Sequence, residues 1–320
     1  MRVASYDRYG GTDVVRVREE ALPTPRRGEV LVRVRAAALN PKDILVQSGK
    51  NRLYRLIAGP RFPKRLGYDW SGEVVACGPG VTEHAVGDAL FGMIDAWAAG
   101  ACATHAIVRV DELARKPATL SWEQAAALPL AGQTALQALR DIAGVERGAR
   151  VLVNGASGGV GTLAVQIAKI LGARVTAVTS SRNLDLVRSL GADDVIDYAT
   201  TNLEDIGERF DVFFDVFGNR SFALAAPLLL ERGVFVSTVP KPHVLRAWAV
   251  TLLRSKRARL VAVRSRARDV ATLADWAERD LLHPVIDSVF PLDQIALAEA
   301  RVSSRRSRGK VVLLTEPPSP

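Results

Sequence analysis

The chain has 320 residues, a formal net charge of +9 and a hydrophobic content of 48%, as expected of a globular protein long enough for two domains. Its two cysteines exclude both a disulfide framework and a four-cysteine zinc lobe. Because no apolar stretch approaches the roughly 18 residues of a membrane helix, we expect a cytoplasmic protein with no membrane span.

The first 120 residues predict a β-rich, barrel-like domain. Short β-branched runs alternate there with turn clusters such as Pro23-Thr24-Pro25 and Gly78-Pro79-Gly80. The expected strands are Val14–Val17, Val30–Val34, Gly72–Val75 and Ala106–Val110.

Residues 121–284 predict a second domain, in which short buried strands alternate with segments of helical length. This alternation is typical of a doubly wound parallel sheet. The expected strands are Val151–Asn154, Val175–Thr179, Val195–Asp197, Val212–Val216, Val234–Ser237 and Leu260–Val263.

The remaining residues, 285–320, predict two more strands, at Pro284–Phe290 and Lys310–Leu314, around a helix at Asp293–Ala300. We expect the final strand to return to the first domain. Residues 1–120 and 285–320 would then form one domain, and 121–284 would be inserted in it. The fold class is therefore α/β.

A glycine-rich loop lies between a predicted strand and a predicted helix, in Val151-Leu-Val-Asn-Gly-Ala-Ser-Gly-Gly-Val-Gly161. Apolar residues recur at helical spacing from Val160 to Leu171. Counted from Ala156, the loop reads A-x-G-x-x-G, with Gly158 and Gly161 in the second and third glycine positions. Glycine there lets the backbone approach a pyrophosphate, which the amides at a helix N-terminus favour. The alternative is a tight structural turn.

The next predicted strand ends without the carboxylate that usually binds the ribose hydroxyl of NAD. No acidic residue stands between Gly172 and Asp185, where the chain reads Ser180-Ser-Arg-Asn183. The serine hydroxyls can donate hydrogen bonds, and Arg182 can pair with a phosphate dianion. The sequence therefore favours NADP(H) over NAD(H) as the cofactor.

Nearly the whole chain resembles the medium-chain dehydrogenase/reductase superfamily, in its zinc-independent quinone oxidoreductase branch, and most of all the reticulon-4-interacting NADPH oxidoreductases. The segments that carry this resemblance are Ala38-Leu-Asn-Pro-Lys-Asp43, Leu66-Gly-Tyr-Asp-Trp-Ser-Gly-Glu-Val74, Gly87-Asp88, Leu128-Pro-Leu-Ala-Gly132, the loop at 154–161, Gly191-Ala-Asp-Asp-Val-Ile-Asp-Tyr198 and Arg308-Gly-Lys-Val-Val312. The resemblance implies a GroES-like catalytic domain, an inserted Rossmann domain, NADP(H) in the cleft between them, and a homodimer.

The resemblance also implies which residues hold the cofactor. Those expected at the pyrophosphate are Ser157, Gly158, Gly159 and Val160, and those expected at the 2′-phosphate or adenosine are Ser180, Arg182 and Tyr198. Alternatively, Tyr198 is only a core residue at the end of a strand and does not contact the cofactor.

Further cofactor contacts are expected at the carboxyl ends of other strands, where the ligands of a doubly wound sheet gather. Those near the nicotinamide are Val216, Gly218, Thr238 and Val239. Phe217 departs from the usual Val-Gly pattern of the family. Thr134, in the helix that enters the second domain, and the basic pair Arg308 and Lys310 are further candidates, although a surface cluster would equally explain the basic pair.

No metal site is expected. The zinc alcohol dehydrogenases of the superfamily place a cysteine at the position of Asn40 and a His-Glu pair at Tyr68-Asp69, whereas a catalytic zinc takes three ligands from the protein. The four histidines are scattered, at His84, His105, His243 and His283. Hydride transfer without a metal needs an acceptor made electrophilic by conjugation, so quinones and α,β-unsaturated carbonyl compounds are the expected substrates.

Asn40 and Tyr68 are the catalytic candidates. Asn40 would orient the substrate oxygen or the nicotinamide ribose, unless it is only a turn residue before Pro41. Tyr68 would donate a hydrogen bond or a proton, or else only pack as an aromatic residue.

The segment 246–268 is basic, with no acidic residue before Asp269. It could attract an acidic substrate, bind nucleic acid, or form a solvated or interface helix. An alternative function follows from it: a weakly catalytic NADPH-binding or sensing protein that engages RNA or a protein partner through its basic face.

Overall fold

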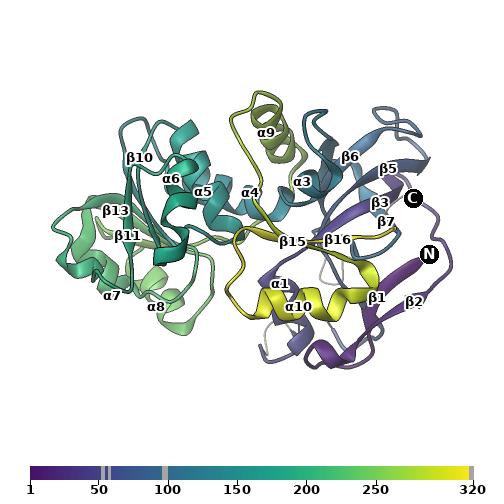
Figure 1. Cartoon of the computed structure of the whole chain (residues 1–320), viewed down its shortest axis with the longest axis horizontal. Coiled ribbons are helices and arrows are strands. Elements are labelled where there is room, and N and C mark those ends of the chain that lie inside the picture. The colour runs from purple at the N-terminus through teal and green to yellow at the C-terminus, as the bar shows by residue number, and fades with distance from the viewer. Residues whose placement is uncertain (52–54, 57–58, 96–99, 317–320) are drawn as a thin grey trace. The chain divides into compact units, whose positions relative to one another are not determined.

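The computed structural model describes residues 1–51, 55–56, 59–95 and 100–316, and the chain divides into two compact units (Figure 1). Unit 1 comprises residues 1–130, 264–280 and 284–320, and unit 2 comprises residues 131–263 and 281–283. Among the helices of the described residues, none is long and apolar enough to cross a membrane.

Unit 1 is built on two sheets whose strands are mostly antiparallel. Their orders are β2-β1-β4 and β15-β16-β3-β5-β6-β8, and β7 also pairs with β3. The strands are β1 (Arg2–Tyr6), β2 (Val15–Glu19), β3 (Glu29–Leu39), β4 (Lys64–Arg65), β5 (Asp69–Cys77), β6 (Ala89–Met93), β7 (His105–Arg109), β8 (Leu113–Arg115), β15 (Ile286–Pro291) and β16 (Lys310–Leu314). The helices are α1 (Pro41–Ser48), α3 (Trp122–Ala126), α9 (Ala267–Glu278) and α10 (Ile295–Ser303), while α4 (Pro129–Leu136) crosses into unit 2.

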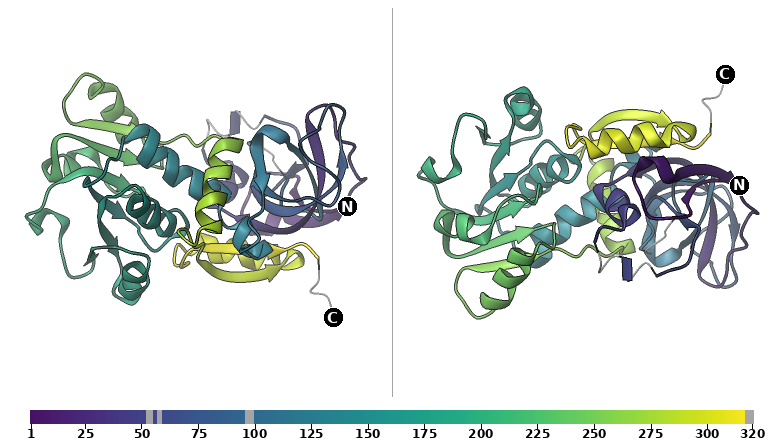
Figure 2. Two further views of the ribbon diagram at one scale, coloured as in Figure 1. Left: turned by 90° about the horizontal axis from the view of Figure 1, so that it is seen from above. Right: turned by 90° about the horizontal axis from the view of Figure 1, so that it is seen from below.

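The long strand β3 organises the core of unit 1. Its valines at 30, 32 and 34 are fully buried, and they belong to the same apolar cluster as the buried Trp70 of β5. The last strand of the chain, β16, pairs antiparallel with β3, with Val311 opposite Leu39. Strand β16 therefore belongs to the same sheet as β3. Figure 2 shows α10 alongside β15 and β16.

Unit 2 contains a six-stranded parallel sheet of order β11-β10-β9-β12-β13-β14, which is the doubly wound order expected for a dinucleotide-binding fold. Its strands are β9 (Arg150–Asn154), β10 (Arg174–Thr179), β11 (Asp194–Asp197), β12 (Phe210–Asp215), β13 (Leu229–Ser237) and β14 (Arg257–Leu260). Its helices are α5 (Gly159–Ile170), α6 (Leu184–Ser189), α7 (Phe222–Ala225) and α8 (Pro242–Val250), with a 3-10 turn, η4 (Ser181–Asn183).

The helices of unit 2 cover both faces of this sheet. Helices α5 and α6 lie on one side of the sheet, and α7 and α8 lie on the other (Figure 1). The central strand β9 is buried on both faces, because Val151, Leu152 and Val153 have no exposed surface. Such a continuous apolar run is what a strand in the middle of a covered parallel sheet requires.

The sixth parallel strand and the limits of the second domain differ most from those expected. The sixth parallel strand covers Arg257–Leu260 rather than Leu260–Val263. The two arginines of this strand make it look unlike a buried strand in the sequence. In the structure, only Ala258 of its four residues is fully buried. Helix α9 was expected in the second domain but belongs to unit 1. The Glu278 carboxylate accepts a hydrogen bond from the Ala118 amide, at 2.9 Å, which ties α9 to the segment before α3.

Candidate active site

The glycine loop of unit 2 joins β9 to α5, and internal packing fixes two of its glycines. Gly155 has a φ of +89°, and its amide and that of Ala156 both donate to the Val178 carbonyl of the neighbouring strand. A Cβ on Gly161 would lie 2.1 Å from the Gly155 carbonyl oxygen. Neither position can carry a side chain without moving the backbone.

Gly158 is different, because nothing in unit 2 requires a glycine there. Its φ of −82° suits any residue, and a Cβ would come no closer than 3.6 Å to another atom. Gly158 is the N-cap of α5, and no side chain caps this helix. The missing side chain therefore keeps open the space over the first-turn amides, which suits an anionic ligand. The loop fits the pyrophosphate of a dinucleotide.

The buried side-chain amide of Asn183, beside the loop, donates hydrogen bonds to two serine hydroxyls. Asn183 is 6% exposed, and its Nδ2 donates to the hydroxyl oxygens of Ser157, at 2.9 Å, and Ser180, at 3.2 Å. The Ser157 oxygen also accepts from the Thr179 hydroxyl, at 2.8 Å. A hydroxyl has two acceptor positions and one proton. Since both acceptor positions of Ser157 are filled, its proton can only donate to another group.

The Ser157 and Ser180 protons have no acceptor among the described residues, and the Asn183 Oδ1 is buried there without a donor. A ligand that brings phosphate oxygens and a sugar hydroxyl would satisfy all three groups. Asn183 belongs to no recognised motif in the sequence. Its position three residues after Ser180, at the end of a 3-10 turn, is the only sequence signal for it.

An acidic group also lies close to this turn. Asp197 ends β11 opposite Thr179 of β10, and its carboxylate accepts from the Ser181 hydroxyl at 2.6 Å. This bond and one from the Ala199 amide lower the pKa of Asp197. The Ser181 hydroxyl is therefore committed to Asp197, unlike that of Ser180. Asp197 does not follow Thr179 in the sequence, because it comes from the neighbouring strand β11.

The other residues expected around the adenosine are on the surface. Arg182 is exposed beside Asn183, and Tyr198 is 57% exposed directly after β11. The Tyr198 amide donates to the Thr179 carbonyl, so this residue lies at the same edge of the sheet as Ser180.

The four residues expected near the nicotinamide come together at the ends of β12 and β13. The Thr238 hydroxyl donates to the Val216 carbonyl at 2.9 Å, and a Cβ on Gly218 would lie 2.3 Å from the Val239 side chain. Phe217 packs against Gly155, since a Cβ added to Gly155 would lie 3.0 Å from the Cβ of Phe217. Thr134 is 5% exposed in α4.

A buried ion pair is the main feature of unit 1. The Lys310 ammonium donates to the Asp69 carboxylate at 2.8 Å and to the Asn40 Oδ1. The Asn40 amide in turn donates to Asp69 at 2.9 Å, and the other Asp69 oxygen accepts from the Leu130 amide at 2.6 Å. Asp69 and Lys310 are 0% and 4% exposed. Strand pairing explains the cluster, because Asn40, Asp69 and Lys310 stand at the same end of β3, β5 and β16.

Asp43 connects the segments that carry the two catalytic candidates. Its buried carboxylate accepts from the amides of Asn40, at 2.8 Å, and Gly67, at 3.0 Å. Burial raises the pKa of Asp43 to about 6, against the opposing effect of these two bonds. Tyr68 is 3% exposed, and the Lys42 ammonium lies 4.0 Å from the centre of its ring. Burial lowers the pKa of Lys42.

Lys310 is thus part of a buried network rather than of a surface cluster. Arg308 remains at the surface, where its amide donates to Asp287 at 2.7 Å. Three groups of predicted site residues therefore come together in the structure. Asn40 contacts Lys310, and Ser157 and Ser180 share the Asn183 amide. Val216, Gly218, Thr238 and Val239 meet at the ends of β12 and β13.

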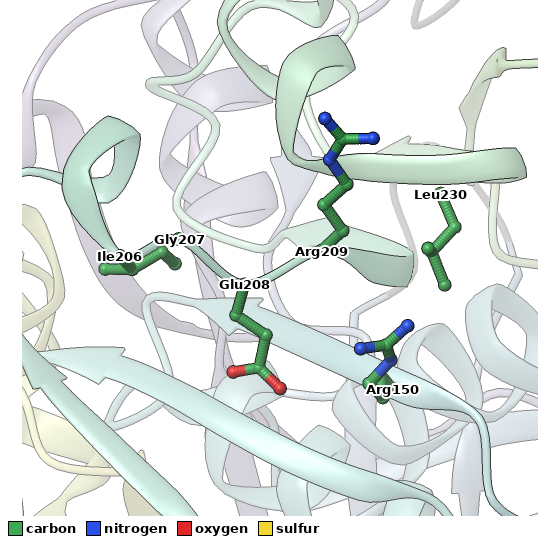
Figure 3. A pocket seen from close by; sticks show the side chains of 6 residues that line it. All are labelled: Arg150, Ile206, Gly207, Glu208, Arg209 and Leu230. Atoms are coloured by element: carbon green, nitrogen blue, oxygen red, sulfur yellow. The ribbon is translucent and has the colours of Figure 1, made fainter.

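A cavity of about 580 Å³ lies at the opposite edge of the unit 2 sheet, at the amino ends of the strands (Figure 3). The residues that line it are Arg150, Ile206, Gly207, Glu208, Arg209 and Leu230. Ligands of parallel sheets bind at the carboxyl ends, so this cavity is not a candidate for the cofactor site.

Comparison with known proteins identifies the family. Residues 26–118 match the family model "Alcohol dehydrogenase GroES-like domain", and residues 190–313 match "Zinc-binding dehydrogenase". The chain is 32% identical over 328 residues to the "Chloroplast envelope quinone oxidoreductase homolog" of Arabidopsis thaliana, with 98% of each chain covered. The chain belongs to the medium-chain dehydrogenase/reductase superfamily.

Other members of this superfamily are similar over comparable lengths. The chain is 36% identical over 324 residues to "2-methylene-furan-3-one reductase" of Solanum lycopersicum, covering 98% of this chain and 79% of the relative. It is 32% identical over 348 residues to "NAD(P)H oxidoreductase RTN4IP1, mitochondrial" of Homo sapiens, covering 96% and 87%. The solved quinone oxidoreductase from Coxiella burnetii has a TM-score of 0.91 and 30% identity, with 99% of each chain covered.

Membership confirms the predicted fold class, with a GroES-like unit 1 and a Rossmann-like unit 2, and it makes the protein an oxidoreductase. Two of the relatives are named for organelles, so the cytoplasmic location stays a prediction. Although one matching model is named for zinc, the described part of the chain holds no group of three His, Cys, Asp or Glu residues that could bind a metal ion.

Proposed function

We propose that the protein is an NADPH-dependent, zinc-independent reductase that transfers hydride to quinones or α,β-unsaturated carbonyl compounds. The observation that carries this proposal is the buried ammonium of Lys310 between Asn40 and Asp69. In the zinc alcohol dehydrogenases, the position of Asn40 is expected to carry a cysteine ligand, and the position of Asp69 the glutamate of a His-Glu pair.

A cation is therefore already present where a metal would bind. Lys310 neutralises Asp69, and a second cation beside its ammonium would face strong repulsion in a buried site. Without a Lewis acid to polarise a simple ketone, the acceptor must be electrophilic through its own conjugation. Charge that develops on the acceptor then spreads to an oxygen that hydrogen bonds can stabilise. The names of two relatives, a quinone oxidoreductase homolog and a furanone reductase, support this substrate class.

The cofactor would supply a hydride from C4 of its nicotinamide ring. The Gly158 loop and the Ser157 hydroxyl would bind the pyrophosphate, while Ser180 and Arg182 would bind the 2′-phosphate. The name of the human relative supports a nicotinamide cofactor. The NADPH preference rests on Ser180, whose proton is available, and on the exposed guanidinium of Arg182.

In unit 1, Asn40 uses its amide protons on Asp69 and on the Ala38 carbonyl, at 3.3 Å. We therefore assign Asn40 to the positioning of Lys310 and of the start of α1, rather than to direct contact with substrate. Lys310 makes two hydrogen bonds, and an ammonium has three protons. The third would orient a substrate oxygen or a ribose hydroxyl. Tyr68 would form an aromatic wall that Lys42 holds in place.

Steady-state assays test the proposal. We expect the protein to oxidise NADPH with 1,4-benzoquinone and 3-buten-2-one, and not with the saturated ketone butanone. EDTA should leave the rate unchanged, and metal analysis should find no stoichiometric zinc. Turnover of butanone, or activity that EDTA abolishes and zinc restores, would contradict the proposal.

The cofactor loop has its own test. Gly158→Ala adds a methyl group that unit 2 can accommodate but a bound pyrophosphate cannot, so we expect an unchanged Tm and a Kd for NADPH raised at least about tenfold. Arg182→Gln should weaken NADPH binding and leave NADH binding unchanged, because only NADPH carries the 2′-phosphate. Equal losses for both cofactors would refute the assignment of Arg182.

A further inference from the structure

Phe217 lies at the point in unit 2 where the order of the parallel strands reverses. The chain adds β10 and β11 on one side of β9 and then returns to place β12 on its other side. Ligands of such sheets bind at the carboxyl ends of the two strands beside this reversal. Phe217 comes two residues after β12, and it packs against Gly155, which directly follows β9. This side chain is therefore placed where a ligand of the sheet is expected.

Hydrogen bonds fix the backbone that presents this side chain. The amides of Val216 and Phe217 both donate to the Asn154 carbonyl, at 3.1 and 3.2 Å. The next amide, of Gly218, donates to the Asp215 carboxylate at 3.0 Å. Since these bonds are already made, a ligand that contacts Phe217 does not have to order the turn first.

The fold does not require an aromatic ring at this position. The resemblance to the family predicts Val-Gly at Phe217-Gly218, so an aliphatic side chain would suffice to cover Gly155. Phe217 is 44% exposed, which means that its packing on Gly155 uses only part of the side chain. A phenyl ring adds a flat apolar face, and such a face stacks favourably on another planar ring.

The nicotinamide is the planar ring that the proposed cofactor would bring to this turn. With its adenosine at Ser180, beside β10, and its pyrophosphate at the loop after β9, the cofactor would extend along the sheet edge to β12. Oxidised nicotinamide carries a positive charge, and reduced nicotinamide does not. Because the face of an aromatic ring attracts a cation, Phe217 would distinguish the two forms.

A buried carboxylate at the same turn also favours the cationic ring. Asp215 is 0% exposed, and it accepts from the Asn154 side-chain amide at 2.7 Å and from the Gly218 and Arg220 amides, both at 3.0 Å. Burial raises the pKa of Asp215, but every one of these partners is an N–H donor, which suits the charged form. Among the described residues Asp215 forms no ion pair. Its negative charge therefore has no cation of the protein to offset it.

We propose that Phe217 stacks on the nicotinamide ring and binds its oxidised, cationic form more tightly than its reduced form. This inference rests on the proposed function, because it takes NADPH as the cofactor. In that reaction the hydride leaves C4 with its electron pair and adds to the acceptor, and the acceptor oxygen takes a proton from water. Because the ring becomes cationic in this step, Phe217 would favour the loss of hydride and slow the release of NADP⁺.

Calorimetric titration of the full chain tests the preference. The three ligands are NADP⁺, NADPH and adenosine 2′,5′-bisphosphate, which lacks the nicotinamide half. Phe217→Val should raise the Kd for NADP⁺ about tenfold, raise that for NADPH less than about threefold, and leave that for adenosine 2′,5′-bisphosphate unchanged. Phe217→Tyr keeps the ring face and should bind all three as wild type does. An unchanged Tm in both variants would separate the loss of stacking from a loss of folding.

A third variant tests the stacking directly. In Phe217→Trp an indole would lie against the nicotinamide, and an electron-rich indole stacked on the electron-poor oxidised ring gives a charge-transfer absorption at longer wavelength than either group alone. We expect this absorption when Phe217→Trp binds NADP⁺. Neither the wild-type protein with NADP⁺ nor the variant with adenosine 2′,5′-bisphosphate should show it.

The failure of this inference and that of the proposed function have different signatures. Equal increases of the Kd for NADP⁺ and NADPH in Phe217→Val would overturn the preference for the oxidised ring. A matching increase for adenosine 2′,5′-bisphosphate, or Phe217→Trp that binds NADP⁺ without the new absorption, would overturn the stacking. If the wild-type protein binds none of the three nucleotides, the proposed function fails and this inference fails with it. If the protein binds them all and Phe217→Val changes nothing, only the role of Phe217 is refuted.

Discussion

Glu299 offers a stringent test of the packing in unit 1. Its side chain is 0% exposed on α10, one oxygen accepts from the Gln47 amide at 3.3 Å, and the other has no partner among the described residues. Burial, together with the nearby charge of Asp43, raises the pKa of Glu299 from 4.5 to about 8, against the opposing effect of the hydrogen bond from Gln47. The folded protein therefore holds a proton here that the unfolded chain releases at lower pH.

The sign and size of the effect follow from this difference. Between pH 4.5 and 8 the folded state binds one more proton than the unfolded state, so the free energy of unfolding falls as pH rises. Each pH unit corresponds to about 1.4 kcal/mol, and the whole interval to about 5 kcal/mol. Glu299→Gln keeps the shape and has no charge at any pH. We expect the variant to lose this slope and to be about 3 to 5 kcal/mol more stable than wild type at pH 8.

Urea unfolding at pH 5, 6, 7 and 8 measures this effect, with tryptophan fluorescence, to which the buried Trp70 of unit 1 contributes, as the signal. The exposed Glu19 supplies the control, and Glu19→Gln should leave the pH dependence of wild type unchanged. If Glu299→Gln has the same slope as wild type, or is less stable at pH 8, then Glu299 does not bind this proton and the reasoning fails.

Three further predictions concern the ion pair of unit 1 and the cofactor loop of unit 2. Lys310→Met should cost unit 1 about 3 to 5 kcal/mol, because it leaves the Asp69 carboxylate buried without its cation. Adding Asp69→Asn should recover most of this loss in urea unfolding, and a double variant no more stable than the single one would contradict the ion-pair account. Asn183→Ala and Ser157→Ala should each raise the Kd for NADPH about three- to tenfold, and the double variant should raise it by less than the product of the two effects, since part of the effect of Asn183 is exerted through Ser157. Multiplied effects in fluorescence titrations would show that the two act separately. Asp197→Asn removes a negative charge beside the Ser180 turn, so the ratio of NADPH to NADH affinity should rise, and an unchanged ratio would place Asp197 outside the 2′-phosphate region.

The sequence predicted the parts of the fold that depend on local pattern. Apolar runs located β9 and β10, and the glycine spacing located the start of α5. The arginines of β14 concealed it, because its pairing with β13 outweighs its composition. The assignment of α9 to unit 1 depends on contacts distant in the chain, such as the one between Glu278 and Ala118.

Only the parts of the candidate site that carry a sequence motif could be predicted. The loop residues and Ser180 carry a motif, so their neighbourhood could be expected. The pairing of Lys310 with Asp69 joins residues 241 positions apart, and no local signal announces it. Asn183 was missed because an asparagine in a polar turn is ordinary until its two protons are traced to Ser157 and Ser180.

The position of β16 in the sheet of unit 1 sets the order in which the protein can be made. Residues 131–263, which provide nearly all of unit 2, leave the ribosome as one uninterrupted stretch and can fold at once. The edge of β3 that pairs with β16 must wait, open to wrong partners, until residues 310–314 are synthesised. Nascent chains arrested before residue 310 should therefore contain a protease-resistant middle and a protease-sensitive beginning.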